Sequence, residues 1–321
     1  MSESLQASHN RNAEICAAIV TYNRKQLLLE LLEAVRRQTY PVKTIVIVDN
    51  HSSDGTTDAL LEKNIIEKAV TDEICKRKWD VKDVLYYYSS SNTGGSGGFQ
   101  KAFEIAGSLD HDFVWMMDDD VEPEETCLET LLDAVSDDAL VCIPNRSGNG
   151  WTERVATAYN LTNPFLVNVK QFKKRVDSTL LPGDSALVAD MPFEGPLIAK
   201  KILKQAGVPD AGYFLFFDDS DYAQRILRYT SIRYVKHAQL KRKIARAVKK
   251  EAPEWRHYYF NRNAFRFDRL YGKNVLVRHF RPFFSCAVRS LAAVARGNRN
   301  RATLLWKAYQ DAVKGRMGKR V

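Results

Sequence analysis

The chain has 321 residues, of which 45% are hydrophobic and 27% are charged, and its formal net charge is +9. This length suits one large domain or two modest ones, and the composition excludes a disordered chain and a collagen-like fibre. The charge is unevenly divided. Residues 1–235 contain 25 basic and 35 acidic side chains, whereas residues 236–321 contain 23 basic and 4 acidic ones. We therefore expect an acidic body followed by a strongly basic C-terminal region.

The chain has an odd number of cysteines at scattered spacings, namely Cys16, Cys75, Cys127, Cys142 and Cys286. The absence of a C-x-x-C pair argues against a zinc site, and the pattern as a whole argues against a disulfide framework and indicates a reducing compartment. The polar N-terminus lacks the apolar core of a signal peptide. No apolar run reaches the ~18 residues of a membrane-spanning helix, so we expect none.

Short apolar segments alternate with helical patterns over the first 145 residues. Strands are predicted at Ile15–Val20, Thr44–Val48, Val84–Tyr88, Phe113–Met117 and Ala139–Ile143. Helices are predicted at Lys25–Gln38, Thr56–Lys68 and Glu124–Val135, with Pro123 in the first turn of the last one. Because the strands are apolar on both faces, they suit a parallel sheet covered on both sides. The alternation predicts an α/β fold, with ligands at the carboxyl ends of the strands.

The rest of the chain is less regular. Residues 146–192 contain several turn signals and no clear period, and we expect an irregular covering loop there. A helix is expected at Ala199–Ala206 and a strand at Ile232–Val235. From Trp255 onward the pattern indicates basic helices.

Three adjacent carboxylates, Asp118, Asp119 and Asp120, directly follow the predicted strand FVWMM. Such neighbours repel one another and raise each other's pKa unless a cation neutralises them. At the end of a strand, the cation we expect is a hard divalent metal that also holds a diphosphate. The alternative is a solvated acidic turn before the next helix. The position at a strand end favours the metal.

A second acidic cluster, Asp218-Asp219-Ser220-Asp221, follows the apolar run FLFF and precedes a helical pattern. A carboxylate at a helix N-terminus beside aromatic side chains can act as a general base for a hydroxyl nucleophile. The alternative is helix capping by Asp218 or Ser220. Both interpretations can hold, because one residue can cap the helix while its neighbour faces the site.

Residues 92–98 (NTGGSGG) lie between a predicted strand and the predicted helix Phe99–Ala106. A glycine-rich turn at a helix N-terminus exposes backbone N–H groups to a phosphate or lets a ligand approach closely. The spacing matches neither G-x-G-x-x-G nor the P-loop pattern. A phosphate loop and a flexible turn that shapes a donor pocket therefore stay open as alternatives.

Polar residues also follow the first two strands, at 21–24 (TYNR) and 49–55 (DNHSSDG). Such side chains at one edge of a sheet suit hydrogen bonds to a base and a ribose, although residues 54–56 could equally be a turn and helix cap. His237 follows a predicted strand and could complete a metal site through a ring nitrogen. A lone histidine is more often structural or exposed.

Together these segments resemble glycosyltransferase family 2, the inverting nucleotide-sugar enzymes with the GT-A fold. The resemblance covers about residues 13–240. It rests on AAIVTYNRKQLLLELLEAVRRQTYP, TIVIVDNHSSDGTTD, SNTGGSGGFQKAFEIA, FVWMMDDDVEP and FEGPLIAKKILKQAGVPDAGYFLFFDDSDYAQRI. NTGGSGGF, the triple Asp, FDDSD and HYYFNRNAFRF are similar to the galactofuranosyltransferase and rhamnosyltransferase branches. The resemblance implies a Rossmann-like GT-A catalytic domain at 13–240, between a polar tail at 1–12 and a basic helical region at 241–321.

The resemblance also implies roles for matching residues. Asp118 and Asp120 would bind Mn²⁺ or Mg²⁺ with His237 as third ligand, and Asp119 would lie nearer the sugar. Asp219 of the pair Asp218–Asp219 would be the catalytic base, although many family members have Glu-Asp here, which leaves open which carboxylate acts. The nucleotide and donor pocket would be formed by Thr21, Asn23, Arg24, Asp49, Asn92, Gly94 and Gly95.

The implied activity is metal-dependent transfer of a sugar, with inversion, to a hydroxyl of a glycan acceptor in bacterial polysaccharide biosynthesis. The expected donor is UDP-galactofuranose or, as the alternative, dTDP-rhamnose, and the expected acceptor is carried on a polyprenyl diphosphate. The expected product is an inverted glycoside formed without a covalent enzyme intermediate.

The basic C-terminal region carries an apolar helical stripe that includes Phe280, Phe283 and Leu291. Cations beside such a stripe indicate attachment to an anionic membrane surface. We therefore expect a cytoplasmic protein, peripheral on the cytoplasmic face of the inner membrane. One alternative is a helical subdomain that packs on the catalytic body. Another is a basic nucleic-acid-binding module, which explains the tail but not the acidic clusters, so we expect no nucleic-acid partner.

Overall fold

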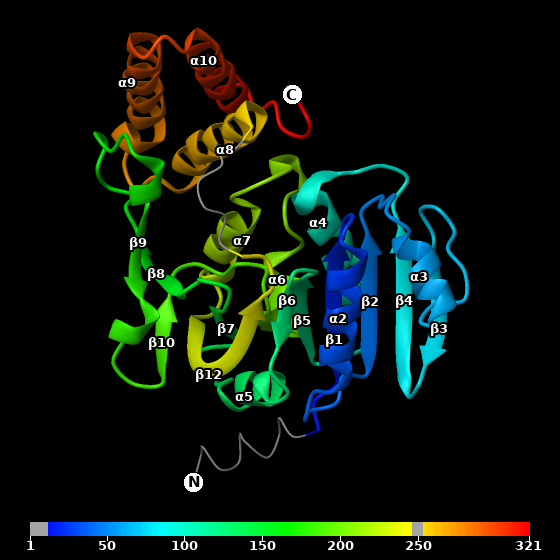
Figure 1. Ribbon diagram of the computed structural model, residues 1–321. Helices are drawn as coiled ribbons and strands as arrows, with labels where there is room; N and C mark the ends of the chain where they lie inside the picture. Colours follow the sequence, from blue (N-terminus) through cyan, green and yellow to red (C-terminus); the bar gives the residue numbers. More distant parts are fainter. Residues whose placement is uncertain (1–11, 246–252) are drawn as a thin grey trace.

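The computed structural model describes residues 12–245 and 253–321. A ten-stranded mixed sheet forms its centre, in the order β10-β12-β7-β11-β5-β1-β2-β4-β3, with β6 paired to β12 (Figure 1). The parallel part contains β1 (Ile15–Thr21), β2 (Thr44–Asp49), β4 (Lys82–Tyr88) and β5 (Phe113–Asp118), and also β7 (Val141–Ser147) beside β12 (Ile232–Arg242). The antiparallel strands are β3 (Ile74–Trp79), β6 (Val121–Pro123), β10 (Ser185–Val188) and β11 (Leu197–Ala199).

Helices cover the sheet, as the apolar strands require. They are α2 (Lys25–Arg36), α3 (Thr56–Glu62), α4 (Gly94–Ser108), α5 (Cys127–Asp133), α6 (Lys200–Ala206) and α7 (Asp218–Ile226). Every residue of β1 is buried, which explains why the strand reads as a continuous apolar run. The prediction of a mostly parallel α/β sheet flanked by helices is confirmed. All five cysteines are buried and free.

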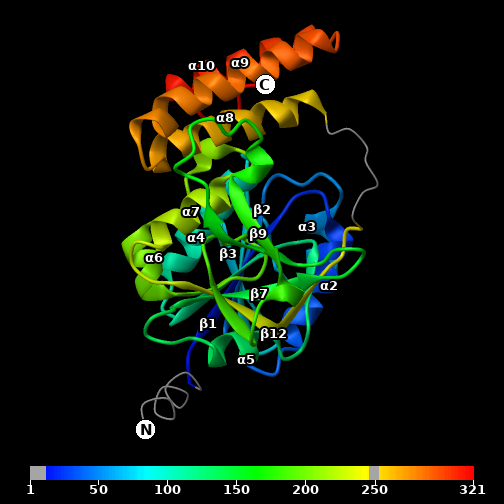
Figure 2. The ribbon, with the colours of Figure 1, turned by 90° about the vertical axis from the view of Figure 1, so that its left-hand side faces the viewer.

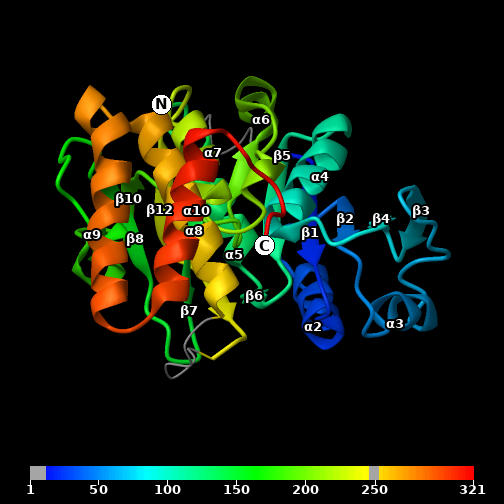
Figure 3. The same cartoon turned by 90° about the horizontal axis from the view of Figure 1, so that it is seen from above.

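The C-terminal helices form a separate layer at one end of the sheet. They are α8 (Glu254–Tyr271), a π-helical turn η4 (Leu276–Phe280), α9 (Arg281–Ala295) and α10 (Arg299–Val313). Figures 1 and 2 show this layer above α7, and Figure 3 shows α8, α9 and α10 side by side. Within the described residues, no helix is long and apolar enough to span a bilayer.

Several predicted elements differ from the structure. Pro123 ends strand β6, where a short outer strand tolerates its missing N–H, and α5 begins only at Cys127. Helix α3 ends at Glu62, well before the predicted Lys68. Residues 146–192 are not one irregular loop, because they contain the hairpin β8 (Arg154–Tyr159) and β9 (Lys173–Asp177), strand β10, and the 3₁₀ turns η1 (Val169–Gln171) and η2 (Ser178–Leu180). A bulge in β8 and the long connection between its strands interrupt the alternating pattern there.

Gly94 begins α4 against the segment 213–217, which starts at the last residue of the 3₁₀ turn η3 (Ala211–Tyr213). A Cβ on Gly94 would lie 2.2 Å from the carbonyl oxygen of Phe214, and the φ of Gly94 is +75°.

 This angle lies in the left-handed region that favours glycine. Glycine is therefore required at position 94 by contact and by conformation.

We expect Gly94→Ala to lower the free energy of unfolding by about 2–4 kcal/mol, because the new methyl group must displace the backbone of Phe214. Gly107 is the matched control, since it lies in the same helix and a Cβ there would meet no atom within 4 Å. Gly107→Ala should raise the free energy of unfolding by about 0.5–1 kcal/mol. Urea unfolding of the two variants measures both values, and equal effects would contradict the close contact.

Candidate active site

The two acidic clusters line one cavity of about 740 Å³. Asp118 at the end of β5 lies in its wall together with Asp218 and Asp219 at the start of α7. Gly95 of α4 also lines this cavity. The fold thus brings together, at the carboxyl end of a central strand, carboxylates that lie about a hundred positions apart in the sequence.

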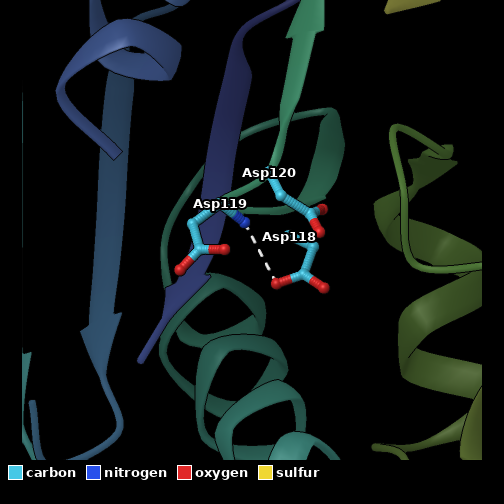
Figure 4. A group of neighbouring side chains, drawn as sticks. All are labelled: Asp118, Asp119 and Asp120. Carbon is cyan, nitrogen blue, oxygen red and sulfur yellow. Dashed lines mark hydrogen bonds between the residues drawn. The ribbon is translucent and has the colours of Figure 1, made fainter. Parts of the chain in front are cut away.

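Asp118 ends β5, and Asp119 and Asp120 form the turn into β6. One carboxylate oxygen from each of the three lies within 4.8 Å of the others. In Figure 4 the carboxylates of Asp118 and Asp120 lie close together, and that of Asp119 points to the other side. Desolvation raises the pKa of all three carboxyls, and repulsion from its neighbours raises that of Asp118 further. These hard oxygen donors fit a Mg²⁺ or Mn²⁺ ion.

The guanidinium group of Arg24 lies against this triple Asp. Its NH1 atom is 2.8 Å from Asp119 Oδ1, 3.0 Å from Asp120 Oδ2 and 4.0 Å from Asp118 Oδ1. Asp119 is 1% exposed and also accepts hydrogen bonds from Thr21 Oγ1 (2.7 Å) and from the Tyr22 backbone N–H (3.2 Å). Asp119 is therefore fixed by protein donors, which leaves Asp118 and Asp120 as the carboxylates that could bind a metal.

Two residues assigned to the nucleotide instead shape the loops at this edge of the sheet. Asp49 is fully buried, and its two oxygens accept from the Ser52 N–H (2.7 Å) and the Tyr86 hydroxyl (3.0 Å). The side-chain oxygen of Asn23 accepts from the Ser53 N–H at 2.7 Å. Neither side chain lines the large cavity. Both residues therefore fix the backbone at Ser52 and Ser53, in the loop that follows β2.

The glycine-rich segment is helical. Residues 94–98 form the first turns of α4, so the predicted helix at Phe99–Ala106 begins five residues too late. The Gly94 N–H donates to Asn92 Oδ1 (2.8 Å), and the Ser96 N–H donates to the Phe214 carbonyl (3.2 Å). Because these donors are already used, the geometry argues against a phosphate loop. Asn50, which the sequence did not single out, accepts from the N–H and hydroxyl of Thr93 and ties β2 to α4.

Asp218 and Asp219 begin α7 and face the large cavity. Burial, together with repulsion by Asp219, raises the pKa of Asp218 to about 7. Burial also raises the pKa of Asp219, while the ammonium group of Lys173 lowers it and the carboxylate of Asp190 raises it. The N-cap residue of α7 is Phe217, which makes no side-chain capping hydrogen bond, so neither Asp218 nor Ser220 is the N-cap. Carboxylates with raised pKa values that line a cavity suit general-base chemistry.

Lys173 connects this pair to its surroundings. Its ammonium group donates to Ser220 Oγ (2.8 Å) and pairs with Asp190. Ser220 in turn donates its backbone N–H to Asp219 Oδ1 at 2.6 Å. Lys173, which lies on strand β9 of the hairpin, thus places a positive charge near Asp219.

The structure does not bring His237, the expected third metal ligand, into the group formed by the triple Asp. His237 does not follow a strand but lies within β12, at a register shift between Val235 and Gln239 where the strand bends strongly (Figure 1). Its Nε2 lies 2.9 Å from Asp184 Oδ1, and its side chain is 65% exposed. Among the described residues, the group of possible metal ligands contains only the three carboxylates of the triple Asp.

The large cavity is also lined by cations that the sequence did not single out. They are Arg154, Lys170, Arg175 and Arg256, together with Lys173. Within residues 12–245 and 253–321, no ion pair joins any of the first four to a carboxylate. Glu194, a further wall residue, pairs with Arg146 (3.3 Å) and Arg242 (2.6 Å). Most of these residues lie in the segment whose hairpin the sequence did not reveal, and no motif marked them.

Residues 16–186, more than half of the chain, match the family described as "Glycosyl transferase family 2". Galactofuranosyltransferase GlfT1 of Mycolicibacterium smegmatis is 27% identical over 220 residues, which cover 67% of this chain and 65% of that protein. GlfT1 of Mycobacterium tuberculosis H37Rv is 24% identical over 230 residues, which cover 67% and 64%. The chain thus matches slightly less than two thirds of the length of these curated relatives.

Solved structures share the fold. GalNAc-T7 with UDP, GalNAc and Mn²⁺ has a TM-score of 0.61 at 12% identity, covering 94% of this chain and 56% of that one. The mannosyltransferase PcManGT from Pyrobaculum calidifontis, in complex with GDP-Man and Mn²⁺, has a TM-score of 0.53 at 13% identity, covering 98% and 95%. The predicted GT-A architecture is therefore confirmed. With its family match and its glycosyltransferase fold, the chain belongs to glycosyl transferase family 2.

Proposed function

We propose that the protein transfers galactofuranose from UDP-galactofuranose to a hydroxyl of a glycan acceptor, with inversion of the anomeric centre, in bacterial polysaccharide biosynthesis. The family accounts for glycosyl transfer from a nucleotide sugar. The similarity to GlfT1 supports galactofuranose as the sugar. The observation that carries the proposal is that Asp118 and Asp219 line one cavity, since transfer requires a donor site and a base within reach of each other.

Asp118 and Asp120 would hold the divalent ion, Mn²⁺ or Mg²⁺, because Asp119 is already bound by Thr21 and Arg24. The ion, when bound, supplies positive charge that neutralises the departing nucleoside diphosphate. Asp119 keeps the turn between β5 and β6 in place. Arg24 contributes a second positive charge beside the same turn.

Asp219 would act on the acceptor. Its carboxylate takes the proton from the attacking hydroxyl, whose oxygen forms a bond to the anomeric carbon. The bond from that carbon to the diphosphate oxygen breaks on the opposite face, and the electron pair leaves with the nucleoside diphosphate. The proton ends on Asp219, and the anomeric centre is inverted. Asp218 lies directly beside Asp219. Repulsion between the two carboxylates raises the pKa of Asp218, so the pair binds a proton more readily.

The cations of the cavity support an acceptor that carries phosphate. Arg154, Lys170, Arg175 and Arg256 face the cavity, and none of them forms an ion pair with a carboxylate among the described residues. A diphosphate on the acceptor would provide their counter-charge, and guanidinium groups bind phosphate oxygens in pairs of hydrogen bonds. We therefore propose an acceptor linked to a polyprenyl diphosphate.

The C-terminal helices support attachment to a membrane surface. Val275 (69% exposed), Leu276 (55%), Leu291 (71%) and Val294 (49%) expose apolar side chains along η4 and α9. Exposed cations, including Arg278, Arg296, Arg299 and Arg301, accompany them. Apolar side chains beside cations suit an anionic lipid surface, and we propose that the protein lies on the cytoplasmic face of the inner membrane.

We expect Asp219→Asn to lower the rate of sugar transfer by about 10²–10⁴-fold, because the amide cannot accept the acceptor's proton. Binding of UDP in the presence of Mn²⁺ should be unchanged. The exposed Asp133 of α5 offers a matched control, and Asp133→Asn should behave as the wild type.

The measurement is transfer from UDP-galactofuranose, dTDP-rhamnose, UDP-glucose and UDP-galactose, before and after chelation with EDTA. Transfer should require Mn²⁺ or Mg²⁺. Activity from dTDP-rhamnose alone would favour the alternative donor, full activity without metal would refute the metal site, and turnover by Asp219→Asn would refute the base.

The rate of transfer should fall as the pH falls through the raised pKa of the base, because the carboxylate acts only when deprotonated. Lys173 lowers the pKa of Asp219, so Lys173→Met should raise that pKa and move the acidic limb of the pH–rate profile to higher pH. Lys174→Met is the control, since Lys174 is exposed and does not line the cavity. Coincident profiles for the two variants would contradict this coupling.

We expect the protein to float with vesicles that contain phosphatidylglycerol, and Leu291→Glu to weaken this binding, because the new carboxylate repels the anionic surface. Val81→Glu is the control, since Val81 is 78% exposed but lies in the turn between β3 and β4, far from α9 (Figure 1). Flotation in sucrose gradients measures binding. Equal binding by wild type and both variants would exclude α9 as the contact surface.

A further inference from the structure

We propose that Asn263 and Arg262 of α8 are positioning residues, which fix the segment 213–217 and through it the carboxylate pair at the start of α7. The inference rests on the proposed function, because it concerns the group assigned there as the base. It gives the C-terminal helices a part in catalysis that is independent of any membrane contact.

The segment 213–217 has an unfavourable backbone. Phe214, Phe216 and Phe217 have φ angles of +63°, +65° and +69°. These angles are rare for bulky residues, so the conformation persists only where contacts from outside the segment hold it. Phe217 is the residue that immediately precedes Asp218, and α7 begins directly after it. Any change in the segment therefore moves the carboxylate pair.

Helix α8 supplies most of these contacts. The Nδ2 group of Asn263 lies 3.0, 2.6 and 2.9 Å from the carbonyl oxygens of Tyr213, Leu215 and Phe216. The NH2 group of Arg262 donates to the carbonyls of Gly212 (3.0 Å) and Tyr213 (2.8 Å). Both side chains are fully buried. The carbonyls of Tyr213, Leu215 and Phe216 are thus satisfied by two side chains of one helix.

Helix α4, which contains Gly94 and Gly95 of the expected sugar-donor pocket, also contacts the segment 213–217. The Ser96 N–H donates to the Phe214 carbonyl at 3.2 Å, and Gly94 allows this close approach. The rings of Phe217 and Phe260 lie 5.6 Å apart, which adds an apolar contact to α8. The segment therefore lies between the helix that borders the donor site and the helix that carries Asn263. A shift of about 1 Å in a reacting group can lower a rate 10²-fold, so this support bears on catalysis.

The chain provides a matched control on the same helix. Asn261 is also buried, at 3% exposure, but its Nδ2 group donates within α8, to the His257 carbonyl at 2.6 Å. Replacing Asn261 removes a buried amide from α8 without removing a contact to the segment 213–217. A merely structural role of Asn263 predicts that the two variants behave alike.

The experiment compares Asn263→Ala with Asn261→Ala in the full chain. Both should lower the melting temperature. Only Asn263→Ala should lower kcat, by about 10–100-fold, with the KM for the nucleotide sugar unchanged, since the donor site is formed by other elements. Binding of UDP in the presence of Mn²⁺, measured by calorimetry, gives the fraction of folded protein by which kcat is normalised. Asn263→Ser keeps one donor, should lose less activity, and replaces Asn263→Ala in the comparison if that variant does not fold.

An unchanged kcat in the Asn263 variants, or an equal loss of kcat in Asn261→Ala, would overturn the inference. An increase of the donor KM with constant kcat would also overturn it, because it would assign Asn263 to donor binding. Absence of transfer by the wild type from every donor tested would overturn the proposed function itself, and this inference with it.

Discussion

The arrangement of the site follows from the electrostatic repulsion among the carboxylates that lie together at one edge of the sheet. Three adjacent carboxylates lie at the end of β5 and in the turn after it, and two more begin α7, where they line the same cavity as Asp118. Desolvation raises their pKa values, so each group needs a partner that supplies positive charge or N–H donors. Arg24 faces the first cluster, and Lys173 faces the second. The remaining elements of the site hold these cations and carboxylates at their places.

The parts of the site come from segments far apart in the chain. The strand ends supply the carboxylates of the triple Asp, the hairpin β8–β9 supplies cations, and α8 supports the segment that precedes α7. The C-terminal layer is thus joined to the catalytic body by buried hydrogen bonds to Tyr213 and Leu215 as well as by packing. The sequence marks this region as basic, but its contacts with the body are polar, buried and specific.

Much of the sheet could be predicted from the sequence because burial on both faces leaves continuous apolar runs. The strand at Phe113–Met117 and the helix at Lys25–Gln38 differ from the structure by only one or two residues at their ends. The position of Asp118 follows from the rule that ligand sites lie at the carboxyl ends of parallel strands, whereas Asp219 reaches the same cavity from the start of α7. Helix α6 likewise begins one residue after its predicted start.

Other features could not be predicted because they depend on pairing between distant segments. The hairpin that carries Arg154 and Arg175 has a bulge and a long connection, which hide its period. His237 was misplaced because β12 continues past Val235 to pair with β6, and its bend turns the ring towards Asp184. The role of Asn263 depends on carbonyl groups of another segment, which leave no trace in the local pattern.

Arg24 has a consequence for the order in which the protein is assembled. Many small metal-binding domains cannot fold until their ion arrives, because nothing else offsets the charge of their ligands. Here the chain supplies its own cation to Asp119 and Asp120. The charge of this turn is therefore offset within the chain itself, so the folding of the proposed metal site does not have to wait for an ion.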